Sequence, residues 1–387
     1  MTERHTVVLT SALMTEVLAG ATALVARPVV SDHGVLLLAQ RTGADAVEGD
    51  VVVALGPDGL EVTFDAVVGM LPGPHVPVPV GTVRVIGDDW RLLLPDGDDG
   101  LGVVFDRQIR AFGPAGQRVL GRLRVGIVGA GGTGSAVFEQ LVRLGVGEIL
   151  IIDPDVINDD GSNVTRVYGS TMADIGQPKV DLADRNADRI GLGTKVTAIK
   201  GTINDEATAR LLTGCDVIFG CTDDNRGRVT LGRIATWYLI PIIDMGVKLT
   251  STDGTLHGIE GRITVIQPGG GCLQCRGRIN AAALQSEVLT PVEREQRVDE
   301  GYATGLEDRD PAVIAFTTGV AALAVSELLH RTFGLDDEPP SGELILQFHR
   351  REIRRNTRRA QPGHWCIEPS NLGAGDTVPF LGTTWTS

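Results

Sequence analysis

A glycine-rich loop is the first feature of the chain with clear chemical potential. The sequence Gly129-Ala-Gly131-Gly132-Thr-Gly134 follows an apolar run and precedes an amphipathic stretch. In a strand–loop–helix unit of this kind, peptide N–H groups and the positive end of the helix face an incoming phosphate, and glycine leaves them uncovered. Asp153 ends the next apolar run, where a carboxylate can accept hydrogen bonds from both hydroxyls of a ribose. The pattern predicts a nucleotide site, although a glycine turn that only permits close helix packing has the same sequence.

Charged residues downstream narrow the choice of nucleotide. The loop and Asp153 alone fit NAD, FAD, S-adenosylmethionine or ATP. Arg166, Lys179 and Asp223 lie in three later segments. An enzyme that attacks a phosphate of ATP needs cations that offset the triphosphate charge and a carboxylate that holds Mg²⁺, whereas hydride transfer needs neither. The three residues therefore favour ATP and Mg²⁺, with Arg166 and Lys179 at the phosphates and Asp223 at the metal.

Each of these side chains also has a structural alternative. Arg166 could form a surface ion pair, and Asp223 could cap the N-terminus of the helix that follows it. Lys179 stands at the start of a predicted helix, where the helix dipole disfavours a cation. A ligand role therefore explains this lysine better than a solvated one.

The five cysteines indicate a metal site rather than disulfides. Their number is odd in a long chain, which argues against a disulfide framework. Cys272 and Cys275 have the spacing of half a tetrahedral zinc site. His364 and Cys366 could complete a Cys₃His set, and the alternative is a cysteine pair that holds no metal. We expect the two remaining cysteines, which flank an apolar run, to be small core residues: Cys215 and Cys221.

The elements that must position these residues follow two patterns. Residues 1–104 alternate short Val- and Leu-rich runs with turn signals, which predicts a small strand-rich N-terminal domain. From residue 105 onward, apolar strands alternate with helical patterns, which predicts an α/β domain with a doubly wound, mainly parallel, Rossmann-like sheet. We assign 105–360 to this nucleotide-binding domain and 361–387 to a C-terminal tail.

Apolar periodicity predicts the individual elements of the nucleotide-binding domain. The expected strands are 124–128, 148–152, 195–200, 216–220, 241–245, 261–267 and 344–348. The expected helices are 135–144, 180–190, 205–212, 226–238 and 311–333.

Composition excludes several classes of partner. The net charge of −14 repels a polyanion from the chain as a whole, so no nucleic-acid partner is expected. The longest uncharged apolar stretch, 312–326, is shorter than the roughly 20 residues that a membrane helix needs. The N-terminus lacks the basic region and cleavage site of a signal peptide. We therefore expect a cytoplasmic protein with no membrane partner.

The ordered motifs of residues 103–360 resemble the ThiF/MoeB/HesA superfamily of ubiquitin-activating-enzyme-like adenylyltransferases. The glycine loop with Ser135 matches the GxGGxGS motif of that family, and Asp153 matches its ribose ligand. Lys179 corresponds to the family's phosphate-binding lysine.

The resemblance also implies roles for residues that the chemistry above does not single out. Asn163 and Arg166 match the family's SN-x-x-R element, and Arg228 follows Asp223 in a TD…R element. Arg107 matches an R-Q motif whose arginine reaches the nucleotide of the partner subunit. The resemblance therefore implies a homodimer with two composite sites.

The reaction implied by the resemblance is adenylation of a carboxylate, most simply the C-terminal glycine of a ubiquitin-like or sulfur-carrier protein that ends in Gly-Gly. The carboxylate attacks the α-phosphate of ATP·Mg²⁺ and releases pyrophosphate. Residues 276–310 contain no cysteine, so a thioester relay on this chain is not expected. The alternatives are an NAD- or FAD-dependent oxidoreductase and a non-catalytic nucleotide-binding dimeric scaffold. The N-terminal domain is expected to serve docking or dimerisation.

Overall fold

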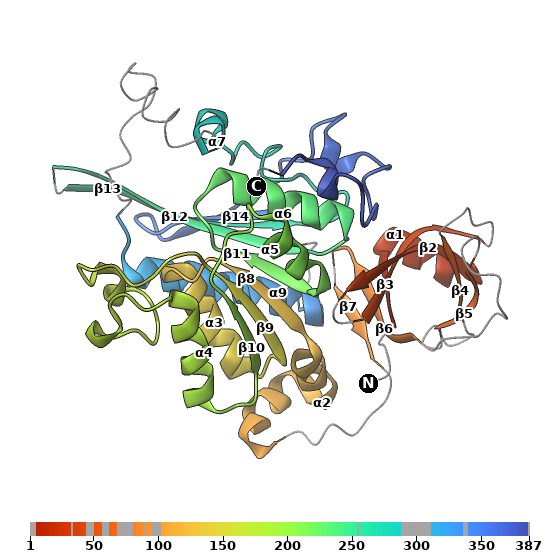
Figure 1. Cartoon of the computed structure of the whole chain (residues 1–387), viewed down its shortest axis with the longest axis horizontal. Coiled ribbons are helices and arrows are strands. Elements are labelled where there is room, and N and C mark those ends of the chain that lie inside the picture. Colours follow the sequence, from red (N-terminus) through yellow and green to blue (C-terminus); the bar gives the residue numbers. More distant parts are fainter. Residues whose placement is uncertain are drawn as a thin grey trace.

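The structure, a computed structural model, contains two β-sheets (Figure 1). It describes residues 5–31, 34–43, 50–55, 62–67, 80–88, 90–94, 102–253, 255–287, 311–335 and 340–385. The N-terminal sheet has seven strands in the order β5-β4-β2-β3-β1-β6-β7, and the larger sheet has eight in the order β10-β9-β8-β11-β12-β13-β14-β15. The predicted α/β class, with a smaller strand-rich N-terminal unit, is confirmed.

Five strands of the larger sheet are parallel, and three more extend it in antiparallel fashion. The parallel strands are β8 (Arg124–Val128), β9 (Glu148–Ile152), β10 (Lys195–Ile199), β11 (Val217–Gly220) and β12 (Ile242–Thr252). The extension consists of β13 (Thr255–Ile266), β14 (Glu343–Gln347) and β15 (Glu352–Arg355). The parallel strands are nearly continuous apolar runs because helices cover both faces of this part of the sheet.

The strand order reverses between β8 and β11. The chain continues from β8 to β9 on one side and returns to β11 on the other. Val128 lies level with Gly220, so β8 and β11 end at the same edge, and Gly220 lies level with Asp244 of β12, which continues beyond them. In an open α/β sheet, ligands bind at the carboxyl edge where the order reverses. This switch point is the place where the glycine loop begins.

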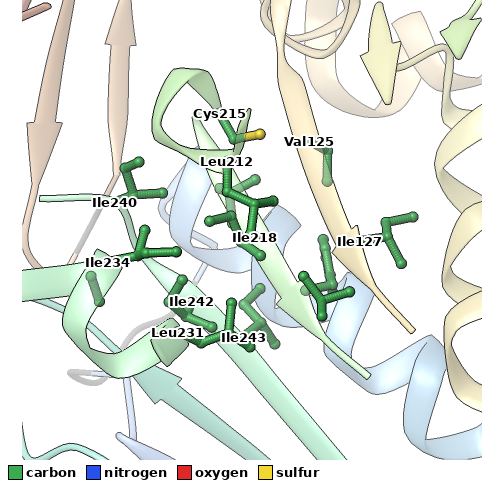
Figure 2. Packing of buried hydrophobic residues seen from close by; sticks show 14 of the residues in the cluster. Val125, Ile127, Leu212, Cys215, Ile218, Leu231, Ile234, Ile240, Ile242 and Ile243 are labelled. Atoms are coloured by element: carbon green, nitrogen blue, oxygen red, sulfur yellow. The ribbon is translucent and has the colours of Figure 1, made fainter. Parts of the chain in front are cut away.

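Helices cover both faces of the larger sheet (Figure 1). On one face, α3 packs between α4 and α9, while α5 and α6 lie on the other. Figure 2 shows Ile234 and Leu231 of α6 beside Ile242 of β12 in the core. The helices are α2 (Asp106–Arg122), α3 (Gly132–Leu144), α4 (Lys179–Ile190), α5 (Glu206–Leu211), α6 (Asn225–Trp237), α7 (Ala281–Glu287) and α9 (Ile314–Phe333).

The N-terminal sheet buries both of its faces. Along β3, Leu37 belongs to a core under α1, whereas Leu36 and Leu38 join the core of the larger domain. This split follows from the two-residue period of a strand. The elements are β1 (His5–Thr10), α1 (Ser11–Leu18), β2 (Ala23–Ser31), β3 (Gly34–Thr42), β4 (Val51–Leu55), β5 (Val62–Val67), β6 (Val80–Ile86) and β7 (Arg91–Leu93).

A buried ion pair links the two sheets. Arg84 of β6 places Nε 2.5 Å from Oδ1 of Asp216, which directly precedes β11. The other oxygen of Asp216 accepts a hydrogen bond from the Arg124 peptide N–H at 2.6 Å. Burial raises the pKa of Asp216, and the Arg84 charge opposes that shift. The small sheet is therefore joined to the larger domain by charge as well as by apolar packing.

The C-terminal segment packs against both parts of the molecule. Gln40 and Arg27 of the N-terminal sheet donate hydrogen bonds to the carbonyls of Gly373 and Ala374, at 2.6 and 3.0 Å. Phe380 is buried in the core of the larger domain. Residues 361–385 thus fill the junction between the two sheets.

The predicted elements of the nucleotide-binding domain all exist, and two strands match to the residue. These are β8 and β9. The prediction missed α2, α7 and β15, and it placed the end of β12 at Met245, whereas the strand continues to Thr252. No helix in the described part of the chain combines the length and apolarity needed to cross a bilayer.

Replacing Arg84 with Ala is expected to weaken the junction because Asp216 would stay buried without its cation. Removing one partner of a buried pair costs about 3–5 kcal/mol, so the free energy of unfolding from urea titration should fall by about 3 kcal/mol. Arg91→Ala, at an exposed position of β7, should cost less than about 0.5 kcal/mol. Equal losses in the two variants would contradict this account of the junction.

Candidate nucleotide site and metal centre

The glycine loop connects β8 to α3 in a conformation that side chains would block. Gly129 has φ 98°, and a Cβ there would lie 2.6 Å from the Cys221 carbonyl oxygen. A Cβ on Gly131 would meet nothing within 4 Å, so the space over this residue is open. Gly131 is the N-cap of α3 and supplies no side-chain hydrogen bond to its first amides. These amides and the helix dipole are thus available to an anion.

Asp153 and Lys179 are both buried beside this loop. The Asp153 carboxylate accepts the peptide N–H of Ala130 at 2.6 Å and that of Asp155 at 2.8 Å. Lys179 Nζ lies 2.7 Å from Asp155 Oδ2 and 3.7 Å from Asp153 Oδ1. Burial raises the pKa of Asp153, and the Lys179 charge counteracts this. The structure therefore brings together the predicted phosphate and ribose ligands.

Sequence reasoning missed Asp155. Its side chain is 63% exposed, in contrast to Asp153 at 6%. The signal was present as a second acidic residue two positions after Asp153. Asp155 offers an accessible carboxylate at the point where Asp153 is already bonded to the backbone.

Arg166 lies over the start of α3. Its Cδ is 3.4 Å from the position that a Cβ on Gly132 would occupy, and its Nη1 donates to the Ser162 carbonyl at 3.0 Å. This hydrogen bond is local, and Arg166 forms no ion pair with the residues that the structure describes, so the alternative of a surface ion pair gains no support. The guanidinium is placed beside the predicted phosphate cradle.

Asn163 and Ser135 are engaged within the protein. The buried Asn163 accepts the peptide N–H of Asn158 at 2.8 Å, and Ser135 Oγ accepts that of Tyr168 at 3.0 Å. Both residues were predicted to contact the nucleotide. In the structure they anchor the segment that carries Arg166 to the loop and to α3.

Asp223 follows β11 and is exposed. The neighbouring Thr222 nitrogen would lie 3.2 Å from a Cβ on Gly129, so this segment borders the glycine loop. The alternative that Asp223 caps α6 is wrong. Asp224 is the N-cap, and its Oδ2 accepts the Gly227 peptide N–H at 2.6 Å. The Asp223 carboxylate is not consumed by the helix.

Arg228 lies in a buried ion cluster instead of facing the loop. Its Nε is 3.7 Å from Asp244 Oδ2, and Arg262 Nη2 is 2.5 Å from Asp244 Oδ1. Asp244 is fully buried in β12. Arg228 as a nucleotide ligand stays a prediction; the sequence analysis did not anticipate Asp244, an acidic residue inside an apolar strand that needs a cation.

Arg107 is remote from the glycine loop of its own chain. It is exposed at the start of α2, and the adjacent Gln108 donates to the Arg143 carbonyl at 2.9 Å. Arg143 lies in the last turn of α3, whereas the loop lies at the first. The helix between them is about 20 Å long. A role for Arg107 at a nucleotide would therefore require the site of another subunit.

Four metal-ligating side chains converge near the C-terminus, as predicted. Distances between neighbouring ligand atoms are 3.9 Å for Cys272–Cys275, 3.7 Å for Cys275–Cys366 and for Cys272–His364, and 3.1 Å for His364–Cys366. All four atoms lie within 4.8 Å of one another. Zn–S bonds of about 2.3 Å in a tetrahedron place sulfur atoms about 3.8 Å apart. The set fits a closed Cys₃His zinc centre.

The other two cysteines are poor nucleophiles. Burial raises the pKa of Cys215 to about 12, and desolvation also raises the pKa of Cys221. Cys215 is fully buried, as expected for a core residue. Since the thiolate is the reactive form, neither residue is prepared to accept an acyl group.

We expect about one zinc ion per chain, measured by elemental analysis of the purified protein. Cys366→Ala should lose the ion and lower the melting temperature, because metal binding stabilises the fold that assembles its ligands. Cys215→Ala should keep the zinc. A wild-type chain that binds no zinc from zinc-containing buffer would contradict the prediction.

The chain is similar to one protein family and to characterised enzymes. A family model described as the ThiF family matches residues 105–366. The molybdopterin-synthase adenylyltransferase of Escherichia coli is 32% identical over 196 residues, which cover 49% of this chain and 74% of that protein. The SAMP-activating enzyme E1 of Haloferax volcanii is 28% identical over 163 residues, which cover 42% of this chain and 56% of that protein.

Solved structures show the same fold. The crystal structure of E. coli MccB with ATP superimposes with a TM-score of 0.53 at 18% identity, covering 69% of this chain and 75% of MccB. SeMet PaaA gives a TM-score of 0.50 at 19% identity, covering 68% of this chain and 87% of PaaA. At these identities the likeness concerns fold alone. The family match spans more than half of the chain and contains the glycine loop, Lys179 and the cysteine cluster, so the chain belongs to the ThiF family.

Proposed function

We propose that the chain adenylates the C-terminal carboxylate of a ubiquitin-like or sulfur-carrier protein that ends in Gly-Gly. A carboxylate oxygen attacks the α-phosphorus of ATP, the bond between the α- and β-phosphates breaks, and pyrophosphate leaves. The observation that carries the proposal is the buried Lys179 beside Asp153 and the open glycine loop, at the edge where the strand order reverses. The relatives named adenylyltransferases support the same reaction class.

The chain's own groups can stabilise the charge that moves in this step. The first amides of α3 and the side chain of Lys179 would bind phosphate oxygens, and Arg166 would offset charge from the other side of Gly132. Asp153 holds the loop through the Ala130 amide and can accept a ribose hydroxyl with its remaining lone pairs. Preorganised donors of this kind cost little reorganisation when the reaction occurs.

The metals have separate roles in the proposal. The exposed carboxylates of Asp223 and Asp155 are oxygen ligands suited to Mg²⁺, which would neutralise the pyrophosphate that leaves. The Cys₃His set supplies four protein ligands and leaves no open position, which is typical of structural zinc. Thiolate ligands of this kind persist in a reducing compartment, and we place the reaction in the cytoplasm.

The role of residues 1–104 remains docking or dimerisation in this proposal. The cluster of potential metal ligands that the described residues contain lies in the larger domain, so the described part of the N-terminal sheet offers no metal site for catalysis. The N-terminal sheet is joined to that domain by Arg84 and by a shared core. It could therefore present a bound protein to the nucleotide site as part of one body.

Lys179→Ala should abolish the reaction. Removing one charge-stabilising donor of a preorganised site costs about 100- to 1,000-fold in rate, measured as ATP–pyrophosphate exchange in the presence of a carrier that ends in Gly-Gly. Lys200→Ala, at an exposed position, should retain wild-type exchange. A nicotinamide or flavin nucleotide that raises the melting temperature while ATP does not would favour an oxidoreductase. ATP binding without exchange for any such carrier would favour a scaffold.

Composite sites in a homodimer predict complementation between two inactive variants. Arg107→Ala and Lys179→Ala should each lack exchange activity, yet a mixed dimer would contain one site with both native residues. Equal mixing with subunit exchange should restore about a quarter of wild-type activity, because half of the dimers are mixed and each has one intact site. A mixture no more active than its components would show that Arg107 does not act across the interface.

A further inference from the structure

Arginines are concentrated in one short segment of an acidic protein. Six of the ten residues 350–359 are arginine, although the chain carries a net charge of −14. All six side chains belong to exposed residues. We call this segment the arginine edge; its arginines are Arg350, Arg351, Arg354, Arg355, Arg358 and Arg359.

The arginine edge includes the last strand of the larger sheet. Among the described strands, β15 pairs with β14 and lies at the end of the strand order. A strand in this position presents backbone N–H and C=O groups along its outer side. The pKa of Glu352 is lowered by its contact with Arg354 and further by the charges of Arg350 and His349. This shift reports a positive field along the strand.

Register places the arginine edge at the same end of the sheet as the nucleotide site. Asp244 lies opposite Thr264, Thr264 lies opposite Glu343, and Arg355 lies opposite Leu344. Gln347, the last residue of β14, lies level with Lys248 through Glu260, so the β14–β15 turn lies beyond the carboxyl end of β11 and beside the second half of β12. Five strand spacings separate β15 from β8, the strand that precedes the glycine loop, which is about 24 Å at about 4.8 Å each. About seven residues of extended chain cover that distance.

We propose that the arginine edge docks an acidic segment of the polypeptide whose C-terminus is adenylated. The acidic segment would lie along β15, with its carboxylates facing the arginines, and a tail of about seven residues would reach the glycine loop. This inference rests on the proposed function for the identity of the reacting carboxylate. It adds the chemistry of the partner surface, which must be acidic and must precede a short free tail.

A polypeptide fits this surface better than a nucleic acid. An open strand edge can bind the backbone of an extended peptide through main-chain hydrogen bonds, while side chains beside it set specificity. A nucleic acid would meet a chain that is strongly negative overall. Arginine binds carboxylates and phosphates alike with paired, planar hydrogen bonds, so the open strand edge and the net charge decide between the two partners.

The arginines could alternatively serve only to prevent association between sheet edges, because charged edge residues have that effect. Replacement by glutamate separates the two roles, since the edge stays charged while its sign is reversed. The test variant is Arg350→Glu/Arg354→Glu/Arg358→Glu. The matched control is Arg189→Glu/Lys195→Glu/Lys200→Glu, which makes the same charge change at exposed positions in and beside β10, at the opposite edge of the sheet.

The probe is a fluorescein-labelled 14-residue peptide with Asp and Glu in its first half and Gly-Gly at its C-terminus, measured by fluorescence anisotropy with the full chain. We expect the Kd to rise about tenfold or more in the test variant, since several exposed charge pairs are lost and reversed. The control variant should change it less than about twofold. Equal Kd values in all three proteins would overturn the proposal, as would equal binding of a peptide with Lys in place of Asp and Glu. Tighter binding of a uridine 12-mer, lost in the test variant, would assign the edge to RNA and also overturn it.

Pyrophosphate exchange with the same peptide separates the two proposals. Binding that depends on the arginine edge, without exchange in any protein, would retain the docking surface and reject adenylation. Exchange whose KM for the peptide is the same in the test and control variants would retain adenylation and reject the docking surface. Unchanged KM for ATP in the test variant would show that the nucleotide site is intact.

Discussion

The structure of the nucleotide site depends on one buried cation. Lys179 is 7% exposed, and an ammonium group removed from water is costly unless carboxylates surround it. Asp153 and Asp155 supply these carboxylates from the end of β9. Asp153 in turn accepts the Ala130 amide of the glycine loop. The need to pair the buried ammonium group of Lys179 with carboxylates therefore joins three segments: the end of β9, the first residue of α4 and the loop that precedes α3.

The rest of the sheet places acidic and basic groups around that centre through register. Parallel pairing brings Val128, Gly220 and Asp244 level, so the segments after β8 and β11 emerge together beside Asp244 of β12. Gly129 permits the close contact with the Cys221 carbonyl that this arrangement needs. The segment that carries Asp223 then borders the loop. Asp244 is buried inside its strand and could not stay unpaired, and two arginines, Arg228 and Arg262, neutralise its charge.

The C-terminal segment connects the parts of the molecule that lie outside the parallel sheet. His364 and Cys366 meet Cys272 and Cys275, which fixes the chain after β13 to the chain after β15. Trp365, between these ligands, donates to Gln274 at 2.9 Å and packs against Trp237 of α6 with the two ring planes tilted by 49°. The residues that follow reach the N-terminal sheet. A single metal centre can thereby hold the arginine edge, α6 and the interdomain junction in one arrangement.

Local patterns in the sequence indicated most elements of the larger domain and the groups that lie within one segment, although they missed α2, α7 and β15. Apolar runs predicted β8 and β9 to the residue, and the glycine loop with Asp153 and Lys179 indicated the nucleotide site. The spacing of Cys272 and Cys275 indicated a metal, because both ligands lie on one turn. Only the tertiary structure decided which distant groups pair. It assigned Arg228 to Asp244, showed Asp155 beside Lys179, and separated Arg107 from the loop of its own chain. The physical reason is that the periodicity of apolar residues shows which side of a helix or strand is buried. The partner of a buried charge depends instead on strand register and on the lengths of the helices that connect the strands, and these are properties of the whole fold.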